Sequence, residues 1–248
     1  MDALGIGHVD GTCLAGMRIG IIGDSLLHQV LQAIECRLQK HVLSRTVVDT
    51  WTYQNSTMEK RVHVLFANGM RLDYVFIGKN LTEHPLQSTT APEALWTLLG
   101  YTPDVLITNL GTFHLTDLEY NRAHRKKKVL SYGPVFSAFP GRVLLVGTPA
   151  KHVHERGSLV CGQDGISLAE LRHWSPNQRE GLLWQKNAAV EWLGRKYNLS
   201  VVPVLATSLE RIDAHVSTTD CSHYCITGLP TLWADMAFTF LCEEHDAG

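Results

Sequence analysis

Residues 17–34 read MRIGIIGDSLLHQVLQAI, and this stretch decides the fold. The apolar run Met17–Ile22 is bounded by Gly23, and a short continuous run of this kind is typical of a buried strand in a parallel sheet. From Ser25 onward, apolar residues recur at helical spacing, which predicts a helix over about 25–40. A strand, a tight turn and a helix in this order are the opening unit of a doubly wound sheet.

The same alternation continues along the chain. Short apolar runs predict further strands, at 62–66, 72–77, 104–109, 142–147 and 199–204. Helical patterns predict helices, at 92–99, 176–197 and 229–241, with a mixed segment at 117–137. No repeat, low-complexity segment or linker divides the chain. We therefore expect one domain over residues 1–248, with its core at about 17–242, in a three-layer α/β/α fold with a central, mostly parallel sheet.

The composition excludes some classes of partner. The formal net charge is −2, whereas binding a nucleic-acid backbone needs concentrated positive charge, so we expect no nucleic-acid partner. The basic run Arg125–Lys128 is interpreted as a solvated helix face rather than a docking patch for an acidic partner. No stretch reaches the roughly 18–20 apolar residues of a membrane span. The start of the chain, residues 1–11, lacks the basic-then-apolar order of a signal peptide.

Cysteines and glycosylation sequons bear on the compartment. Asn-x-Ser/Thr sequons at Asn55, Asn80 and Asn198 favour a secretory route, whereas the missing signal leaves the cytoplasm open. Cysteines stand at 13, 36, 161, 221, 225 and 242. Six cysteines allow 15 pairings, and the sequence does not choose among them. Cys221 and Cys225 flank His223, so one or both are candidates to tie that loop to Cys161, Cys36 or another partner.

The first group of candidate catalytic residues is Gly23-Asp24-Ser25. The serine follows a buried strand and opens a helix, so its hydroxyl is expected at the carboxyl edge of the sheet, where open α/β sheets bind ligands. Its N–H would belong to the helix N-terminus, which favours negative charge. Ser25 is therefore a candidate nucleophile. The alternative is that this serine is only the N-cap of the helix.

A second set is Asp220-Cys221-Ser222-His223. A serine hydroxyl needs a base to take its proton, and a histidine oriented by a carboxylate suits that role. The spacing of three predicts that Asp220 and His223 lie on one turn; the alternative is a capped, exposed turn before the last helix. In a doubly wound sheet, residues following the first strand and residues preceding the last helix can converge on one edge. The two sets together predict a site.

Gly-Asp-Ser near the start and Asp-x-x-His near the end resemble the SGNH, or GDSL, hydrolases. A closer resemblance is to the PC-esterase group, and within it to the trichome-birefringence-like polysaccharide O-acetyltransferases. Residues 220–230 read DCSHYCITGLP, which resembles that family's DCSHWCLPGVP, and Trp233 matches the tryptophan that follows. Arg211–His215, Asp104–Gly111 and Cys36 also match family elements. The sequence departs from the family at several positions. Tyr224 and Thr227 replace a tryptophan and a proline within the run, and Thr112-Phe113-His114 stands where the family tends to have His-Trp. The cysteine-containing module that precedes the catalytic domain in plant members is absent.

The resemblance implies roles for particular residues. Ser25 would be the nucleophile, His223 the general base and then acid, and Asp220 its orienter. The oxyanion would be held by the Ser25 N–H with help from Asn109, Gly111 and Gly69; the alternative for Asn109 is a strand-end residue that satisfies backbone groups. Weaker candidates for substrate binding are His215, Arg211 and Tyr224, and a structural role for the segment 211–215 is an equal alternative.

The implied reaction is transfer of an acyl group, acetyl by resemblance, through an acyl-enzyme on a carbohydrate. The acetyl group passes to a sugar hydroxyl in an O-acetyltransferase or to water in an acetylesterase. The partners are then a carbohydrate and an acetyl donor, in the Golgi lumen or outside the cell by resemblance. A third reading is a non-catalytic glycan-binding protein on the same fold, and a fourth, a lipid or thioester hydrolase, would need an exposed apolar groove.

Two other kinds of site are weighed against the residues. His152-x-His154 and Cys221-x-His223-x-Cys225 lack the second paired unit that structural zinc requires, so no metal is expected. No glycine-rich phosphate loop is present, so no nucleotide cofactor is expected. Trp51, Trp174 and Trp184 could stack on sugar rings, but buried aromatic packing is the simpler reading.

Overall fold

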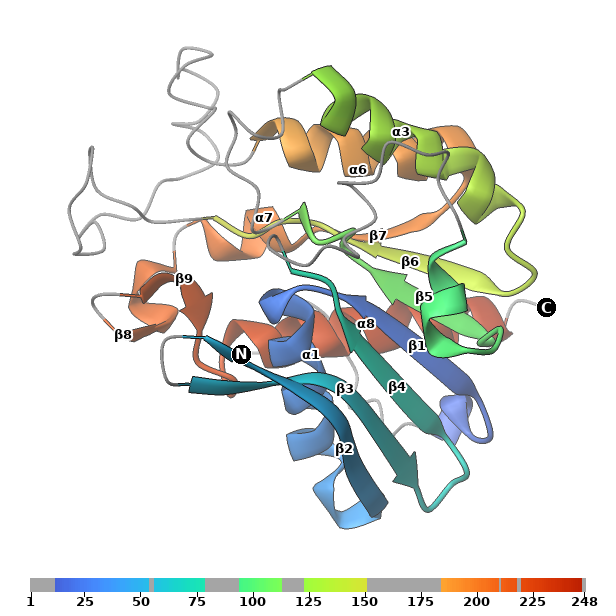
Figure 1. Ribbon diagram of the computed structural model, residues 1–248, viewed down its shortest axis with the longest axis vertical. Coiled ribbons are helices and arrows are strands. Elements are labelled where there is room, and N and C mark those ends of the chain that lie inside the picture. Colours follow the sequence, from blue (N-terminus) through green and yellow to red (C-terminus); the bar gives the residue numbers. More distant parts are fainter. Residues whose placement is uncertain are drawn as a thin grey trace.

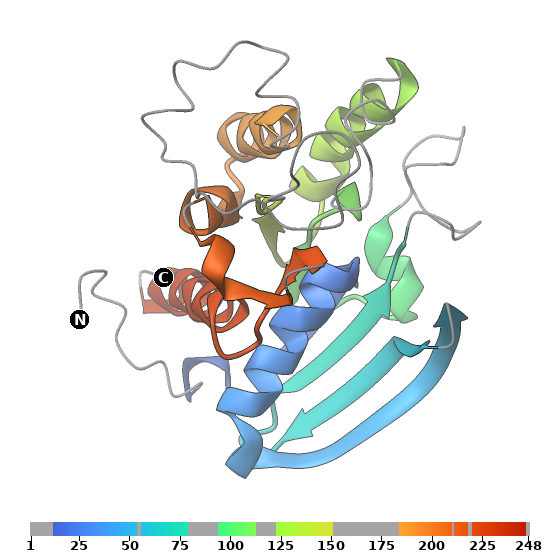
Figure 2. The same ribbon diagram turned by 90° about the vertical axis from the view of Figure 1, so that its left-hand side faces the viewer.

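Strand β1 (Arg18–Gly23) runs through the middle of a seven-stranded sheet that helices cover on both faces (Figures 1 and 2). The structure is a computed structural model that describes residues 12–53, 56–78, 94–112, 123–150, 184–209, 211–217 and 220–246. The strand order is β2-β3-β4-β1-β5-β6-β7. From β4 to β7 neighbouring strands are parallel, whereas β2, β3 and β4 pair antiparallel. The mostly parallel sheet predicted from the sequence is confirmed.

The remaining elements follow in chain order. The other strands of the large sheet are β2 (Val42–Tyr53), β3 (Ser56–Phe66), β4 (Arg71–Phe76), β5 (Val105–Thr108), β6 (Arg142–Val146) and β7 (Ser200–Val202). The α-helices are α1 (Ser25–Arg37), α3 (Ala123–Ser137), α6 (Trp184–Tyr197), α7 (Val204–Ser208) and α8 (Leu229–Asp246). Short 3-10 turns are η1 (Thr12–Leu14), η2 (Gln39–His41), η3 (Leu95–Leu99) and η5 (Ile212–Ala214). A separate antiparallel pair is formed by β8 (His215–Ser217) and β9 (Asp220–Tyr224).

Side-chain alternation along the strands divides the core in two. Ile19 and Ile21 of β1 belong to the cluster beneath α1 and α8, whereas Ile22 belongs to the cluster beneath α3 and α6. Strand β5 repeats the pattern, with Val105 and Ile107 on one side and Leu106 on the other. This period of two is what a sheet buried on both faces requires. The sheet therefore holds the ends of its central strands in fixed places.

Some predicted elements differ in the structure. Strand β2 was not predicted from the sequence, and β3 begins six residues before the predicted strand 62–66. Strand β3 pairs with β4 only from Arg61 to Leu65, so the rest of the β2–β3 ribbon extends past the carboxyl end of β4. The described part of the predicted helix 92–99 is the 3-10 turn η3. Asp220 and His223 lie on a strand rather than on a helical turn.

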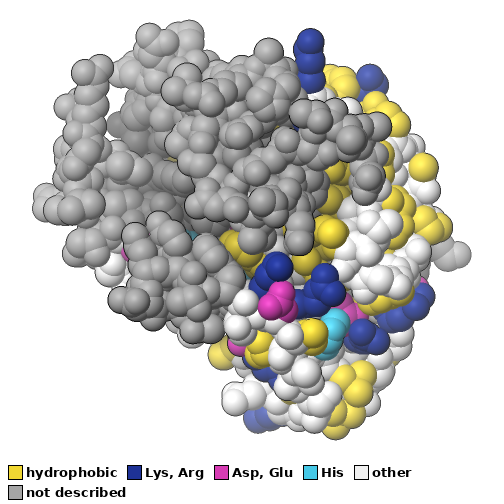
Figure 3. Space-filling model, viewed as in Figure 1, with side chains coloured by type: hydrophobic (Ala, Val, Ile, Leu, Met, Phe, Trp, Pro, Cys, Tyr) yellow, Lys and Arg dark blue, Asp and Glu magenta, His cyan; other side chains and the backbone are white. Residues whose placement is uncertain are grey.

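The outer face of β3 and β4 carries a charged cluster around Asp73 (Figure 3). The Asp73 side chain is fully buried and contacts the His63 ring, the Arg71 guanidinium and the Tyr101 hydroxyl. Burial is the main cause of a raised pKa for Tyr101, and the bond to Asp73 adds to it. A buried carboxylate needs such partners, because burying an unpaired charge is costly. The cluster lies beside the amino end of β4, away from the edge that carries Ser25.

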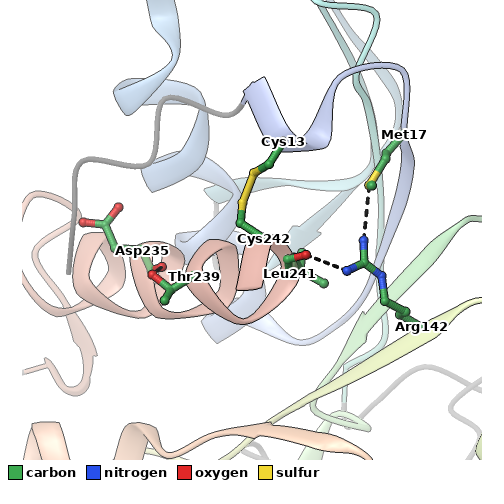
Figure 4. Close-up of a disulfide and its surroundings, with 7 residues drawn as sticks. All are labelled: Cys13, Met17, Arg142, Asp235, Thr239, Leu241 and Cys242. Carbon is green, nitrogen blue, oxygen red and sulfur yellow. Dashed lines mark hydrogen bonds between the residues drawn. A yellow bond between two sulfur atoms is a disulfide. The ribbon is translucent and has the colours of Figure 1, made fainter. Parts of the chain in front are cut away.

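A disulfide joins Cys13 to Cys242, across a sequence separation of 229 residues (Figure 4). Beside it, Nη1 of Arg142 donates to the carbonyl oxygen of Leu241. Cys36 and Cys225 are exposed thiols. The hypothesis that Cys225 ties the loop around His223 to another cysteine is therefore wrong in this structure. Cys161 and the side chain of Cys221 lie outside the described part of the chain.

The basic run at 125–128 lies on α3. Lys127 is exposed, but Lys128 is only 9% exposed, so the prediction of a fully solvated face is wrong at Lys128. The side chains of Arg125 and Lys126 lie outside the described set. Among the helices within the described ranges, none combines the length and apolar character needed to cross a membrane.

Candidate active site

Ser25 is the first residue of α1, directly after β1 and the Asp24 turn. Asp24 is extended, with φ −90° and ψ −165°, and its carboxylate accepts the Leu26 N–H at 3.1 Å. The N-cap is therefore Asp24, which removes the alternative reading of Ser25 as a capping residue. A Cβ at Gly23 would lie 2.5 Å from Asn109 Oδ1 and from a Leu27 methyl, so a larger residue there would displace these side chains.

The structure brings together Ser25, His223 and Asp220. Nε2 of His223 lies 2.8 Å from Ser25 Oγ, and Nδ1 lies 2.9 Å from Asp220 Oδ2. Because a carboxylate only accepts hydrogen bonds, Nδ1 carries a proton when the ring is neutral, which leaves Nε2 to accept from the serine hydroxyl. Figures 1 and 2 show β9 beside the first turn of α1. The side chains of His223 and Asp220 are 30% and 35% exposed, so solvent reaches both groups.

Asn109, at the carboxyl end of β5, locks the turn before Ser25. Its Nδ2 donates to Asp24 Oδ1 at 2.7 Å, and its Oδ1 accepts the N–H of Gly111 at 3.0 Å. Both Asn109 and Asp24 are buried, and the Tyr74 hydroxyl donates to the Asp24 carbonyl at 3.1 Å. The amide nitrogen of Asn109 has two hydrogens, and the bond to Asp24 uses one. The Gly111 N–H donates to Asn109 within the turn, so the prediction that Gly111 helps to hold the oxyanion is corrected.

Gly69 is not at this edge of the sheet. It has φ +80° in the turn between β3 and β4, and its N–H donates to the carbonyl of Phe66. Because β4 runs parallel to β1 with Arg71 opposite Arg18, Gly69 lies at the opposite end of the strand from Ser25. Six residues of strand separate the two ends, about 20 Å. The prediction of Gly69 as an oxyanion donor is therefore wrong.

Gly78 lies where the sequence analysis placed Gly69. It is buried and comes two residues after Phe76, the β4 residue opposite Gly23. The Ile77 N–H donates to the Gly23 carbonyl at 2.7 Å, so the chain at this point is fixed against the turn that precedes Ser25. A glycine directly after a buried strand was the available signal. Gly69 precedes the same strand, at its opposite end.

The three candidate substrate-binding residues do not present free polar groups to a substrate. Tyr224 is fully buried, with its hydroxyl donating to the Ala150 carbonyl at 2.7 Å; burial raises its pKa. His215 is 8% exposed, and Nδ1 bonds to the carbonyl oxygen of His223. Arg211 is exposed but paired with Asp213, two residues away. The alternative structural role given for the segment 211–215 therefore fits His215, and the contacts of Tyr224 are also structural.

The described part of the chain contains neither a group of metal ligands nor the side chains of the tryptophans considered for stacking on sugars. Within the described ranges, no three His, Cys, Asp or Glu side chains are grouped as metal ligands. His152, His154 and Trp174 lie outside those ranges, as do the side chains of Trp51 and Trp184. The sequons at Asn55 and Asn80 also lie outside, whereas Asn198 follows α6 with φ +52°.

Comparisons with known proteins reveal similarity in fold. No protein-family model and no curated protein matches the sequence. A protein described as a GDSL-like lipase from Parabacteroides merdae aligns with a TM-score of 0.52 and 11% identity over 92% of this chain and 96% of that one.

Two acetylxylan esterases show the same similarity. The enzyme AlAXEase aligns with a TM-score of 0.50 and 13% identity, over 90% of this chain and 99% of its own. Axe2 from Geobacillus stearothermophilus aligns with a TM-score of 0.50 and 12% identity, over 93% of this chain and 96% of its own. These matches confirm the predicted three-layer α/β/α fold, which GDSL-like hydrolases and acetylxylan esterases share. The closer resemblance to the PC-esterase group stays a prediction.

Proposed function

We propose that this protein moves an acetyl group from a carbohydrate ester through an acyl-enzyme on Ser25. The observation that carries the proposal is the alignment of three side chains, in which Ser25 Oγ lies 2.8 Å from Nε2 of His223 and Asp220 holds Nδ1 at 2.9 Å. A serine hydroxyl is a weak nucleophile until an adjacent base takes its proton. A glycan-binding module has no need for this alignment.

Acylation follows from the geometry. Ser25 Oγ attacks the ester carbonyl carbon while its proton passes to Nε2 of His223, and Asp220 stabilises the imidazolium that forms. The negative charge develops on the former carbonyl oxygen. The donors proposed for it are the Ser25 N–H at the start of α1, the second amide hydrogen of Asn109 and the N–H of Gly78. The tetrahedral intermediate then breaks its bond to the sugar oxygen, which leaves with the proton from His223.

Deacylation returns Ser25 to its starting state. His223 takes a proton from water or from a second sugar hydroxyl, and that oxygen attacks the acyl carbon. The tetrahedral intermediate then breaks its bond to Ser25 Oγ, which takes the proton back from His223. Water gives acetate, and a sugar hydroxyl gives a transferred acetyl group. Hydrolysis is the outcome that the site supports best, because the side chains of His223 and Asp220 are about one-third exposed.

Two observations bear on the substrate. Neighbours in fold include two acetylxylan esterases, which makes an O-acetylated carbohydrate the first substrate class to test. The run 220–230 resembles that of polysaccharide O-acetyltransferases, which favours transfer to a sugar as the second candidate reaction. A disulfide between Cys13 and Cys242 favours an oxidising compartment, such as the secretory pathway.

The proposal is tested by acetate release from p-nitrophenyl acetate and from an O-acetylated xylo-oligosaccharide. Wild type is compared with Ser25→Ala and with Ser131→Ala, a matched change on α3 that removes a hydroxyl bonded to the Lys128 carbonyl. Each reaction is run with and without an unacetylated oligosaccharide acceptor. A fluorophosphonate probe labels the nucleophile in parallel.

Release and labelling that vanish only in Ser25→Ala support the acyl-enzyme. Diversion of the acetyl group to the added oligosaccharide identifies a transferase, and release indifferent to acceptor identifies an esterase. Equal activity in wild type and Ser25→Ala removes Ser25 as nucleophile. Glycan binding without labelling or release supports the glycan-binding reading instead.

A further inference from the structure

The base and the nucleophile lie 198 residues apart in sequence, yet their reacting atoms are in hydrogen-bond contact. Ser25 is fixed by the central sheet and α1, whereas β9 pairs only with β8. A two-stranded ribbon is marginally stable by itself. Contacts beyond the backbone pairing of β8 with β9 must therefore hold His223 at the distance that proton transfer needs.

Gln29 provides one such contact. It lies four residues after Ser25 on α1, so the two side chains project from the same face of the helix. Its Nε2 donates to the Tyr224 carbonyl at 2.7 Å, and its Oε1 accepts the Tyr224 N–H at 3.3 Å. Gln29 is only 8% exposed, so water does not compete freely for these bonds. Helix α1, which carries Ser25, is thus hydrogen-bonded to Tyr224, the residue that follows His223.

His215 provides a second contact from β8. Its Nδ1 lies 2.7 Å from the His223 carbonyl oxygen, and because a carbonyl only accepts, Nδ1 is the donor. The ring stacks on Tyr224, with centroids 4.4 Å apart and planes 24° apart. Tyr224 also packs edge-on against Trp233 of α8, with centroids 5.4 Å apart. Core packing therefore sets the position of His215.

Gln29 and His215 act on one peptide group. Of the peptide that joins His223 to Tyr224, the carbonyl oxygen bonds to His215 and the N–H bonds to Gln29. The preceding N–H, that of His223 itself, donates to Asp220 Oδ1 at 3.1 Å. With the polar backbone groups on both sides of its Cα held, the direction of the His223 side chain is fixed.

We infer that Gln29 and His215 are positioning residues that clamp the peptide after His223 and thereby hold its imidazole against Ser25. The inference rests on the proposed function of Ser25 and His223. Without the clamp, β9 keeps its backbone pairing with β8 but loses the two bonds from Gln29 of α1 and the side-chain bond from His215. A misplacement of about 1 Å can cost about 100-fold in rate, because proton transfer depends steeply on geometry.

Three variants separate positioning from folding. Gln29→Leu removes both amide bonds at similar size. His215→Phe keeps a ring over Tyr224 but loses the donor, and His215→Asn restores a donor nitrogen near the place of Nδ1. The control is Tyr101→Phe, which removes a half-buried hydroxyl bonded to Asp73 beyond the amino end of β5. For each protein, kcat and KM on p-nitrophenyl acetate, the rate of fluorophosphonate labelling at Ser25 and Tm are measured.

We expect Gln29→Leu and His215→Phe to lower kcat and the labelling rate about 10- to 100-fold, with KM within about twofold. His215→Asn recovers part of the loss, and Tyr101→Phe lowers Tm without changing kcat. The clamp is overturned if Gln29→Leu and His215→Phe lower only Tm. If Gln29→Leu does not fold, His215→Phe and His215→Asn decide the question. A wild-type protein that neither labels nor releases acetate overturns the proposed function and the clamp together.

Discussion

Replacing Cys13 and Cys242 with alanine should cost this protein a large part of its stability. The bond closes a loop of 229 residues, and the chain-entropy relation gives about 5 kcal/mol for a loop of that length. The unfolding entropy is about 2.1 cal/mol/K per residue, so dividing this free-energy loss by the entropy of a 248-residue chain gives a Tm lower by about 10 °C. The bonds from Arg142 to Leu241 and Met17 remain, so the native packing of α8 should survive.

The assay is urea unfolding followed by tryptophan fluorescence, for wild type and the double variant, each with and without a reducing agent. Wild type should lose stability on reduction and become similar to the variant, which should not respond. Mass spectrometry of peptides from the unreduced protein checks that Cys13 and Cys242 are the pair. A wild-type midpoint that reduction leaves unchanged, or a different pair of bonded peptides, would refute the reasoning.

Two further outcomes are expected. Asp220→Asn should lower kcat by about 10³- to 10⁴-fold with little change in fold, because an amide at this place favours the wrong tautomer of His223. Steady-state kinetics measure the loss of kcat, and circular dichroism checks the fold. A loss of less than tenfold would contradict the role proposed for Asp220. Glu59 has a lowered pKa, chiefly because Arg45 donates to it, so its stabilising effect is present above the pKa of the unfolded chain and is lost as pH falls through the folded value. Near pH 7, the free energy of unfolding of Glu59→Gln should therefore be about 0.5–1 kcal/mol lower than that of wild type. Below about pH 4 the two free energies should become similar. A difference that does not change with pH would show that the charge of Glu59 is not the cause.

Local sequence predicted the strand–turn–helix unit around Ser25 because its physics is local. The apolar run of β1, the glycine that fits under Asn109 and the helical spacing after Ser25 are all contained in the segment 17–34. Asp220 and His223 could be paired for the same reason, since a spacing of three keeps them within reach. Their contact with Ser25 followed from the expected topology and from a family resemblance, not from spacing.

Other residues could not be placed without strand order and direction. Gly69 and Gly78 flank the same strand, and only the parallel pairing of β4 with β1 shows which glycine is at the Ser25 end. Strand β2 escaped prediction because it is an exposed edge with bulges, so its apolar residues do not alternate cleanly. Tyr224 and His215 were candidates for a substrate site through the family resemblance, whereas their partners are backbone groups that a sequence does not reveal.

The separation of Ser25 from His223 also has a consequence during synthesis. At about 5–20 residues per second, the ribosome adds His223 roughly 10–40 s after Ser25. Throughout that interval the nascent chain contains Ser25 without its hydrogen-bond partner His223, and Gln29 lacks the strand whose backbone it binds. Under the proposed function, activity would begin only when β9 docks on α1, so its appearance would report that the last part of the chain has folded onto the first.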